Sequence, residues 1–187
     1  MLLAQRITEA EYRDLILHDD YVTWELWDGV PREKPGMTAT HGDAMALLGT
    51  RLFNQLDRRE YRVRFNHAKA RISPRNYYIP DVAVIPAAYF GPGWDDPRNL
   101  DAYADPLSLV VEIWSPTTGD YDVDVKLLGY KERGDEEIWY LHPYERTLTI
   151  WRRQADGTYA EVVLTGGIVE PASLPGVAID LDELFAG

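Results

Sequence analysis

The sequence predicts a mixed α/β (α+β) fold, a β-sheet flanked by helices in a single domain. Two nearly continuous apolar stretches, 81–85 and 107–114, are typical of strands covered on both faces. Residues 41–56 carry apolar side chains at helical spacing, and residues 121–133 predict a second helix that ends at Gly134. A length of 187 residues fits one domain. These observations together favour a sheet with helices packed on it.

The N-terminal part predicts a helix, a strand and a loop. Residues 8–17 predict a short helix that Thr8 caps, with Glu9 and Glu11 in its first turn. Residues 21–27 predict a strand, and the Asp28-Gly29 pair after it is a strong turn signal. We expect residues 31–36 to form a loop before the helix at 41–56.

Residues 61–65 and 68–72 both alternate apolar and basic side chains, which predicts a hairpin turning at Asn66-His67. Four basic residues share one face of this hairpin: Arg62, Arg64, Lys69 and Arg71. Two interpretations stay open for that face. It is either a solvated charged surface or a strip that contacts phosphates.

The remaining segments alternate loops and strands around the helix at 121–133. We expect a loop at 86–105, a turn at 115–119, strands at 137–141, 147–152 and 159–164, and a short closing segment from residue 174. Within the single domain 1–187 we expect an N-terminal helix-and-hairpin appendage at 1–36, a core at 37–153, and a C-terminal hairpin with the closing segment at 154–187.

Charge and composition narrow the functional classes. The chain has 31 acidic and 19 basic residues and a net charge of −12, which argues against a polybasic coat for nucleic acid. Residues 51–75 nevertheless hold 8 basic and 2 acidic side chains, whereas residues 76–125 hold 1 and 9. The absence of cysteine excludes disulfides and thiolate metal sites. With neither a membrane-length apolar run nor a signal-peptide pattern, we expect a cytoplasmic protein.

Two acids interrupt the two most apolar strands. Asp81 opens one strand and Glu112 lies inside the other, and acids are rarely buried without a partner. If the strands are neighbours, the carboxylates lie about 5 Å apart and repel by about 3 kcal/mol at an effective dielectric of about 20. A proton or a cation must relieve this repulsion, and oxygen ligands favour Mg²⁺ or Mn²⁺. The alternative is that an arginine or backbone amides satisfy each acid separately.

The helix after the second apolar strand carries a polar stripe. Asp122, Lys126 and Tyr130 are four residues apart and therefore share a helix face. A strand–turn–helix unit can fold this face back so that Lys126 reaches the carboxylate pair, where it could stabilise charge on a phosphoryl group. The alternative is an ordinary surface ion pair between Asp122 and Lys126.

Several motifs follow one another in an order that resembles a known group. They are residues 24–29, His41 with its helix, residues 78–84 with Pro80-Asp81, residues 111–118 with Glu112, the series Asp122, Lys126, Tyr130 and Gly134, and residues 137–139 and 174–176. Together they resemble the PD-(D/E)XK nuclease superfamily, and within it a bacterial family of restriction-endonuclease-like proteins, the Uma-two type. The motifs span most of the chain.

The resemblance implies a restriction-endonuclease-like mixed sheet and phosphodiester cleavage that depends on a divalent metal. It implies that Asp81 and Glu112 are metal ligands. The superfamily's usual lysine two residues after the glutamate is Trp114 here, and Lys126 is expected to replace it as the catalytic lysine. Glu25 and His41 match recurrent positions of the family. Glu25 either approaches the metal or is a surface acid, and His41 either supports the site or caps its helix.

We therefore expect a Mg²⁺- or Mn²⁺-dependent endonuclease acting on DNA, with a homodimer favoured because two symmetric sites cut both strands most easily. Two alternatives remain open. One is a non-catalytic module that keeps the nuclease fold and binds nucleic acid or protein. The other is a metal-dependent phosphoesterase that acts on small molecules, which the net negative charge favours.

Overall fold

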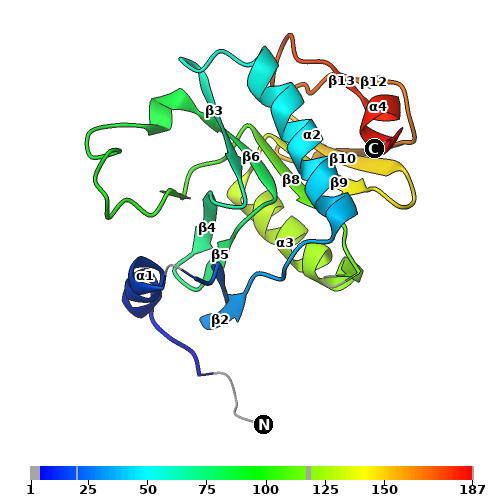
Figure 1. Ribbon diagram of the computed structural model, residues 1–187. Helices are drawn as coiled ribbons and strands as arrows, with labels where there is room; N and C mark the ends of the chain where they lie inside the picture. Colours follow the sequence, from blue (N-terminus) through cyan, green and yellow to red (C-terminus); the bar gives the residue numbers. More distant parts are fainter. Residues whose placement is uncertain (1–4, 20, 117–118, 187) are drawn as a thin grey trace.

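The computed structural model describes residues 5–19, 21–116 and 119–186, with only the backbone of residues 120–122. Its strands form three sheets with helices packed around them (Figure 1). The helices are α1 (Glu9–His18), α2 (Ala39–Gln55), the 3-10 helix η1 (Ala87–Tyr89), α3 (Gly119–Arg133) and α4 (Leu181–Ala186). The strands are β1 (Trp24–Trp27), β2 (Val30–Glu33), β3 (Tyr61–Phe65), β4 (Lys69–Ser73), β5 (Asn76–Tyr78), β6 (Val82–Pro86), β7 (Ala102–Tyr103), β8 (Leu109–Ile113), β9 (Glu137–His142), β10 (Thr147–Arg153), β11 (Tyr159–Leu164), β12 (Ile168–Val169) and β13 (Ile179–Asp180).

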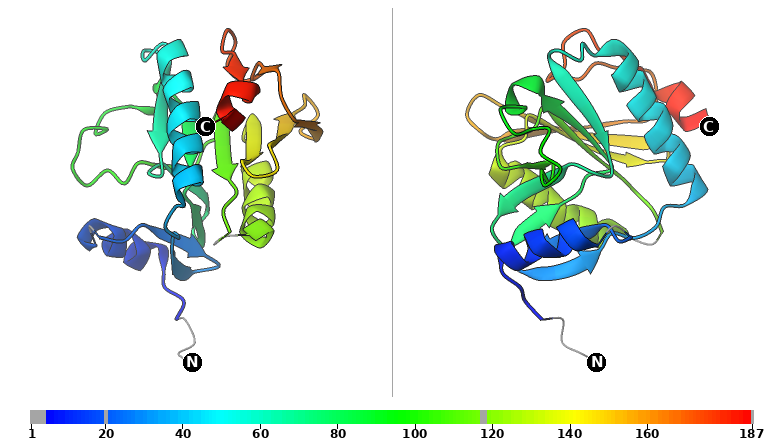
Figure 2. Two further views of the ribbon diagram at one scale, coloured as in Figure 1. Left: turned by 45° about the vertical axis from the view of Figure 1, so that its right-hand side comes forward. Right: turned by 60° about the vertical axis from the view of Figure 1, so that its left-hand side comes forward.

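A six-stranded sheet in the order β11-β10-β9-β8-β6-β3 forms the centre of the molecule. Its β8–β9 pair is parallel and its other pairs are antiparallel, so the sheet is mixed. Helices α2 and α4 bury their apolar faces on one side of it, and α3 packs on the other (Figure 2). The predicted mixed α+β class is therefore confirmed.

The register of β6 and β8 determines where the two predicted acids lie. These strands are antiparallel neighbours, with Val82 opposite Val111. Continuing this register by one residue places Asp81 opposite Glu112, at the end of the pairing and on one face of the sheet. That face is the one α3 covers, because Val82 and Val111 point into the core on the α2 side. Burial of both strands, predicted from their apolar runs, is confirmed.

A second, five-stranded sheet in the order β2-β1-β5-β4-β7 shows that the predicted hairpin is wrong. Strand β3 pairs with β6 in the large sheet, whereas β4 pairs with β5 and β7 in the small one. The chain crosses between the sheets at residues 66–68, where the Asn66 N–H donates to the Asp81 carbonyl (3.0 Å). Alternation along a strand specifies its faces, but it does not specify its partner.

Residues 31–36 are only partly the loop that we expected, because β2 extends to Glu33. Pro31 is tolerated there because β2 is an edge strand, where a missing N–H disturbs no ladder. The expected strand at 21–27 is confirmed only from Trp24 onward, and the 86–105 loop contains η1 and β7. The cap of α1 is confirmed, since Thr8 and Glu11 form a reciprocal capping box. Among the described residues no helix has the length and apolar character to span a membrane.

Candidate active site

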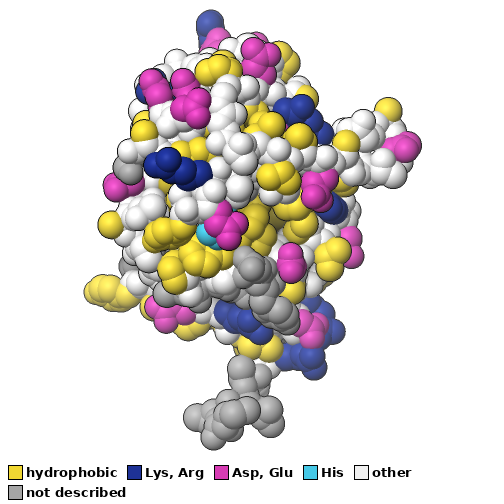
Figure 3. Space-filling view, turned by 90° about the vertical axis from the view of Figure 1, so that its right-hand side faces the viewer, with side chains coloured by type: hydrophobic (Ala, Val, Ile, Leu, Met, Phe, Trp, Pro, Cys, Tyr) yellow, Lys and Arg dark blue, Asp and Glu magenta, His cyan; other side chains and the backbone are white. Residues whose placement is uncertain are grey.

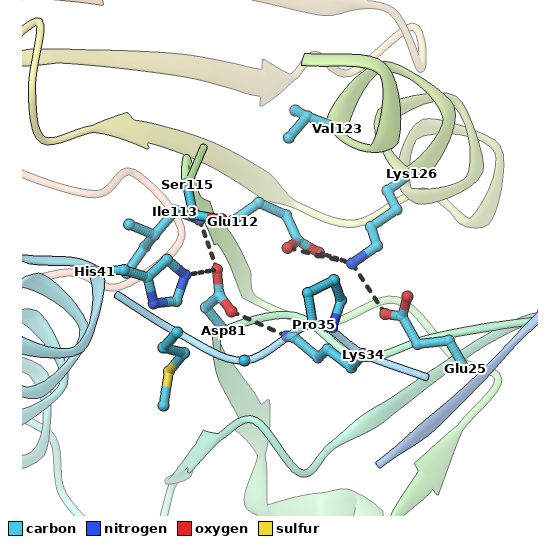
Figure 4. Close-up of a pocket in the computed structure, with 12 residues that line it drawn as sticks. Glu25, Lys34, Pro35, His41, Asp81, Glu112, Ile113, Ser115, Val123 and Lys126 are labelled. Carbon is cyan, nitrogen blue, oxygen red and sulfur yellow. Dashed lines mark hydrogen bonds and ion pairs between the residues drawn. The ribbon is translucent and has the colours of Figure 1, made fainter. Parts of the chain in front are cut away.

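Six ionisable side chains gather in one pocket, where β6 begins and β8 ends (Figure 4). They come from β1, the segment after β2, α2, the start of β6, β8 and α3, and are Glu25, Lys34, His41, Asp81, Glu112 and Lys126. The pocket therefore joins the six-stranded sheet, the five-stranded sheet and two helices. These charged side chains lie beside strands whose other side chains form the apolar core.

Asp81 is a buried carboxylate with three donors. Its Oδ1 lies 2.9 Å from the ammonium of Lys34, and its Oδ2 accepts from the Ile113 N–H (2.7 Å) and lies 3.0 Å from His41 Nε2. Burial by itself would raise the pKa of Asp81, but Lys34 and His41 outweigh it and hold the pKa well below its usual range. Asp81 is therefore ionised at neutral pH.

Glu112 and Lys126 form a buried ion pair, so the prediction that α3 folds Lys126 back onto the acids is confirmed as geometry. The Lys126 ammonium lies 3.3 Å from Glu112 Oε1 and 2.9 Å from Glu25 Oε1, and the Tyr130 hydroxyl donates to Glu112 Oε1 (2.6 Å). Burial raises the pKa of Glu112 despite Lys126. Burial opposes the charge of Lys126, yet Glu112 and Glu25 together raise its pKa, so the lysine is firmly protonated.

Glu25 lies inside the pocket, so the alternative of a surface acid is excluded. Besides Lys126, it accepts hydrogen bonds from the Ile79 N–H (2.7 Å) and from Trp27 Nε1 (3.0 Å). These donors lie on β1 and just after β5, the paired strands of the small sheet. Glu25 thus fixes the small sheet against α3 through a single carboxylate.

His41 reaches the site from the first turn of α2. Thr38 caps that helix by accepting the His41 N–H (3.3 Å), which directs the ring toward Asp81. The buried Nδ1 has no hydrogen-bond partner among the described residues. Asp122 lies on α3 as predicted, but its side chain is outside the described part of the chain. Trp114 stacks on His142 with ring centroids 4.4 Å apart, so it packs beside the site.

Lys34 is the pocket residue that the sequence did not reveal. It follows β2 directly, in a stretch without regular secondary structure, and donates to the Ile79 carbonyl as well as to Asp81. Neither helical nor strand periodicity covers this position, so no pattern links Lys34 to residues almost fifty positions away. Its place before Pro35-Gly36, between two predicted elements, was the only local signal.

The four basic residues of the predicted hairpin do not form one strip, because they lie on two sheets. Arg64 is 2.9 Å from Asp101 and Arg71 is 2.7 Å from Glu9, so acids already hold both. Lys69 is buried and donates to a backbone carbonyl, and Arg62 lies over an aromatic ring. None of these four residues lines the pocket. Their contact with phosphates stays a prediction.

The donor types in the pocket fit a hard divalent cation. Carboxylate oxygens from Asp81 and Glu112 share its wall, and Mg²⁺ is commonly held by one or two carboxylates together with waters and substrate phosphates. Together with Glu25, the pocket has three acids, which is one more than its two lysines, Lys34 and Lys126. In the described part of the chain, no three acids or histidines lie close enough together to hold a metal by themselves. The three acids of the pocket instead form ion pairs with Lys34 and Lys126.

Comparisons with known proteins identify the family and the fold. Residues 9–182 match the Uma2 family, which is described as "Putative restriction endonuclease". A solved structure, "a putative nuclease belonging to DUF820 from Anabaena variabilis ATCC 29413", has the same fold with a TM-score of 0.78. It is 18% identical, and the alignment covers 96% of this chain and 98% of that one. No curated protein matches. Because the family match extends over nearly the whole described chain, the protein belongs to the Uma2 family of restriction-endonuclease-like proteins.

Proposed function

We propose that this chain is a Mg²⁺- or Mn²⁺-dependent endonuclease that hydrolyses phosphodiester bonds in DNA. One observation carries the proposal. A buried lysine, Lys126, pairs with Glu112 in the same pocket that holds the ionised Asp81, in a chain of a restriction-endonuclease-like family. Two acids on adjoining strands can hold a divalent cation for such hydrolysis, and a lysine on the neighbouring helix can stabilise the charge that develops on the phosphate.

Each side chain has a separate role in this proposal. Asp81 and Glu112 would hold the cation, which would supply Lewis-acid polarisation of the phosphate and activation of the attacking water. Lys126 keeps Glu112 oriented and places a fixed positive charge beside the phosphate, where negative charge develops in the transition state. His41 keeps the Asp81 carboxylate in one orientation from the opposite side.

A plasmid-nicking assay tests the proposal. We expect the wild-type protein to nick supercoiled DNA with Mg²⁺ or Mn²⁺ and to lose this activity in EDTA. Asp81→Asn keeps the volume of the side chain and removes the charge, so it should abolish nicking. Glu183→Gln is the matched control, since Glu183 is an exposed acid paired with Arg51. Equal nicking by wild type and Asp81→Asn would contradict the proposal.

A homodimer would extend the same proposal to double-strand cuts, since each chain holds one such pocket. The products of the nicking assay report on this. Linear plasmid that accumulates without a nicked intermediate indicates paired sites, whereas nicked circles indicate one site acting at a time. Light scattering on the same sample gives the mass of the assembly.

A non-catalytic module is the second candidate, because both lysines of the pocket already pair with its acids and Trp114 stands where the superfamily has a lysine. Such a module would show no metal-dependent rise in melting temperature. Stabilisation by millimolar Mg²⁺ or Mn²⁺ that is lost in Glu112→Gln would exclude it.

A further inference from the structure

Lys34 holds Asp81 from a part of the chain that differs from the rest of the site. The residue begins a stretch, 34–38, that has no regular secondary structure and crosses the pocket (Figure 4). Three residues of this stretch, Pro35, Gly36 and Met37, line the pocket with it. The Lys34 N–H still donates to the Thr23 carbonyl (2.8 Å), next to the last β1–β2 pair, so a movement of the ammonium is a movement of the side chain and not of the backbone.

The two oxygens of Asp81 are held in different ways. Oδ2 contacts the Ile113 N–H on β8 and His41 Nε2 on α2, and both of these donors belong to regular elements packed in the core. Oδ1 contacts the Lys34 ammonium. If Lys34 moved away, two donors would still orient the carboxylate, and Oδ1 would face the pocket.

Lys126 does not have this freedom. Its ammonium lies between Glu25 and Glu112, and it extends from the middle of α3. Its removal would leave two buried carboxylates facing each other without a counter-charge, which is strongly unfavourable. Of the two lysines in the pocket, Lys34 is therefore the one that can leave its carboxylate without leaving a buried acid unsatisfied.

We propose that Lys34 and a divalent cation exchange at Oδ1 of Asp81, and that the released Lys34 ammonium then contacts a phosphate oxygen of the substrate. The inference rests on the proposed nuclease function. An ammonium and a divalent cation on one carboxylate oxygen repel each other, so binding of the metal favours release of the lysine. The released charge stays tethered at the pocket, and a lysine ammonium is a good point charge for a phosphate.

The first test measures metal binding without activity. Calorimetry with Mn²⁺ compares wild type, Lys34→Gln and Lys131→Gln. Lys131 is the matched control because it lies on α3 against Trp151 and Tyr159, outside the pocket. We expect Lys34→Gln to bind Mn²⁺ about tenfold more tightly than wild type, since a competing cation is gone, while Lys131→Gln stays within about twofold. Unchanged or weaker binding by Lys34→Gln would overturn the exchange.

The second test measures the phosphate contact at saturating Mn²⁺. Lys34→Gln should raise the KM for duplex DNA about tenfold, and Lys34→Arg, which keeps the charge, should restore most of the loss. A purely structural lysine would instead weaken metal binding and cleavage together. If Lys34→Gln has the KM of wild type, the phosphate contact is wrong. If wild type neither binds Mn²⁺ nor cleaves, the nuclease function fails and this inference fails with it.

Discussion

The pairing of Lys126 with two glutamates makes it a structural charge as well as a candidate catalytic one. Glu25 and Glu112 are both buried, and the ammonium is within 3.3 Å of each. Removing one member of a buried ion pair typically costs about 3–5 kcal/mol, because the remaining charge stays desolvated. Loss of activity in a Lys126 variant would thus mix chemistry with folding.

Lys126→Met should lower the free energy of unfolding by about 3–5 kcal/mol at pH 7, and by less at pH 5. Burial already raises the pKa of Glu112 above its ordinary 4.5, and losing Lys126 raises it further. Between pH 4.5 and this raised pKa, the folded protein binds more protons than the unfolded chain, so stability rises as the pH falls.

Urea unfolding of Lys126→Met at both pH values checks this expectation, with Lys131→Met on the same helix as the control. A loss of stability that is the same at pH 5 and pH 7 would show that protonation of Glu112 does not relieve the site.

The same residues show what the sequence could reveal about the site. Asp81 and Glu112 stood out as acids in apolar strands, and Lys126 and Tyr130 followed from helical spacing. All four lie together. Lys34 could not be found in this way, because its contact with Asp81 is made by tertiary folding of an irregular segment. Local periodicity carries information about faces of helices and strands only.

At the scale of elements, the position of α3 against the small sheet depends on a close approach at Gly129. A Cβ at this residue would lie 2.7 Å from Cε2 of Tyr78 and 3.2 Å from Cγ1 of Ile72. Tyr78 cannot easily move aside, because it is buried and packs its ring edge-on against Tyr130. Helix α3 also carries Lys126, so this contact sets the distance between the lysine and its acids.

Gly129→Ala should therefore destabilise the protein by about 1–3 kcal/mol, even though alanine is intrinsically the better helix former by about 1 kcal/mol. Gly42→Ala is the matched control in α2, since a Cβ there meets nothing within 4 Å, and it should be neutral or stabilising. Thermal unfolding of the two variants gives the comparison. A Gly129→Ala protein as stable as Gly42→Ala would mean that the helix can shift away from the sheet freely.

Glu9 joins helix α1 to the small sheet through an ion pair and a hydrogen bond. Glu9 lies 2.7 Å from Arg71 on β4 and also accepts from the Tyr77 hydroxyl on β5. Arg71, followed by Tyr77, lowers the pKa of Glu9 from 4.5 to about 2. The ring of Tyr12 on α1 packs against Tyr77 with centroids 4.9 Å apart. Polar and aromatic contacts thus meet at the same place.

Glu9→Gln should cost about 1 kcal/mol of stability or less at neutral pH, because the pair is partly exposed to solvent. Since the folded pKa is below the unfolded one, the contribution of Glu9 is complete above pH 4.5 and is lost as the pH falls toward 2. The difference between wild type and Glu9→Gln should therefore be smaller at pH 3 than at pH 7 in urea unfolding. A difference that is constant with pH would assign the effect to packing alone.

The predicted hairpin shows the limit of sequence patterns at this scale. The alternation at 61–65 and 68–72 correctly indicated two strands, but it could not show that they enter different sheets. Pairing of β3 with β6 and of β4 with β5 depends on side-chain packing between distant segments. The buried strands β6 and β8 were easier to predict, because strands covered on both faces give continuous apolar runs.

For the whole molecule, the distribution of charge limits how it can bind a polyanion. The chain has 31 acidic and 19 basic residues. On the face in Figure 3, lysine and arginine side chains form small separate groups with acids near them rather than one basic strip. Arg64 and Arg71 of the basic segment already pair with acids. The number of cations available for phosphates is therefore small.

DNA binding should accordingly be weak and depend only shallowly on salt. Each neutralised phosphate contributes about −0.9 to the slope of log K against log salt, so a few contacts give a slope of about −1 to −3. The measurement uses Asp81→Asn, which should bind without cutting, and a labelled duplex at about 25 to 200 mM salt.

Arg64→Gln should leave the slope unchanged because Asp101 holds that side chain. In the Asp81→Asn protein Lys34 has lost its carboxylate partner. If its ammonium then meets a phosphate, Lys34→Gln in the same background should make the slope shallower by about one contact. A slope steeper than about −5 for the Asp81→Asn protein would contradict this account, because so steep a slope requires a basic surface that these residues do not provide.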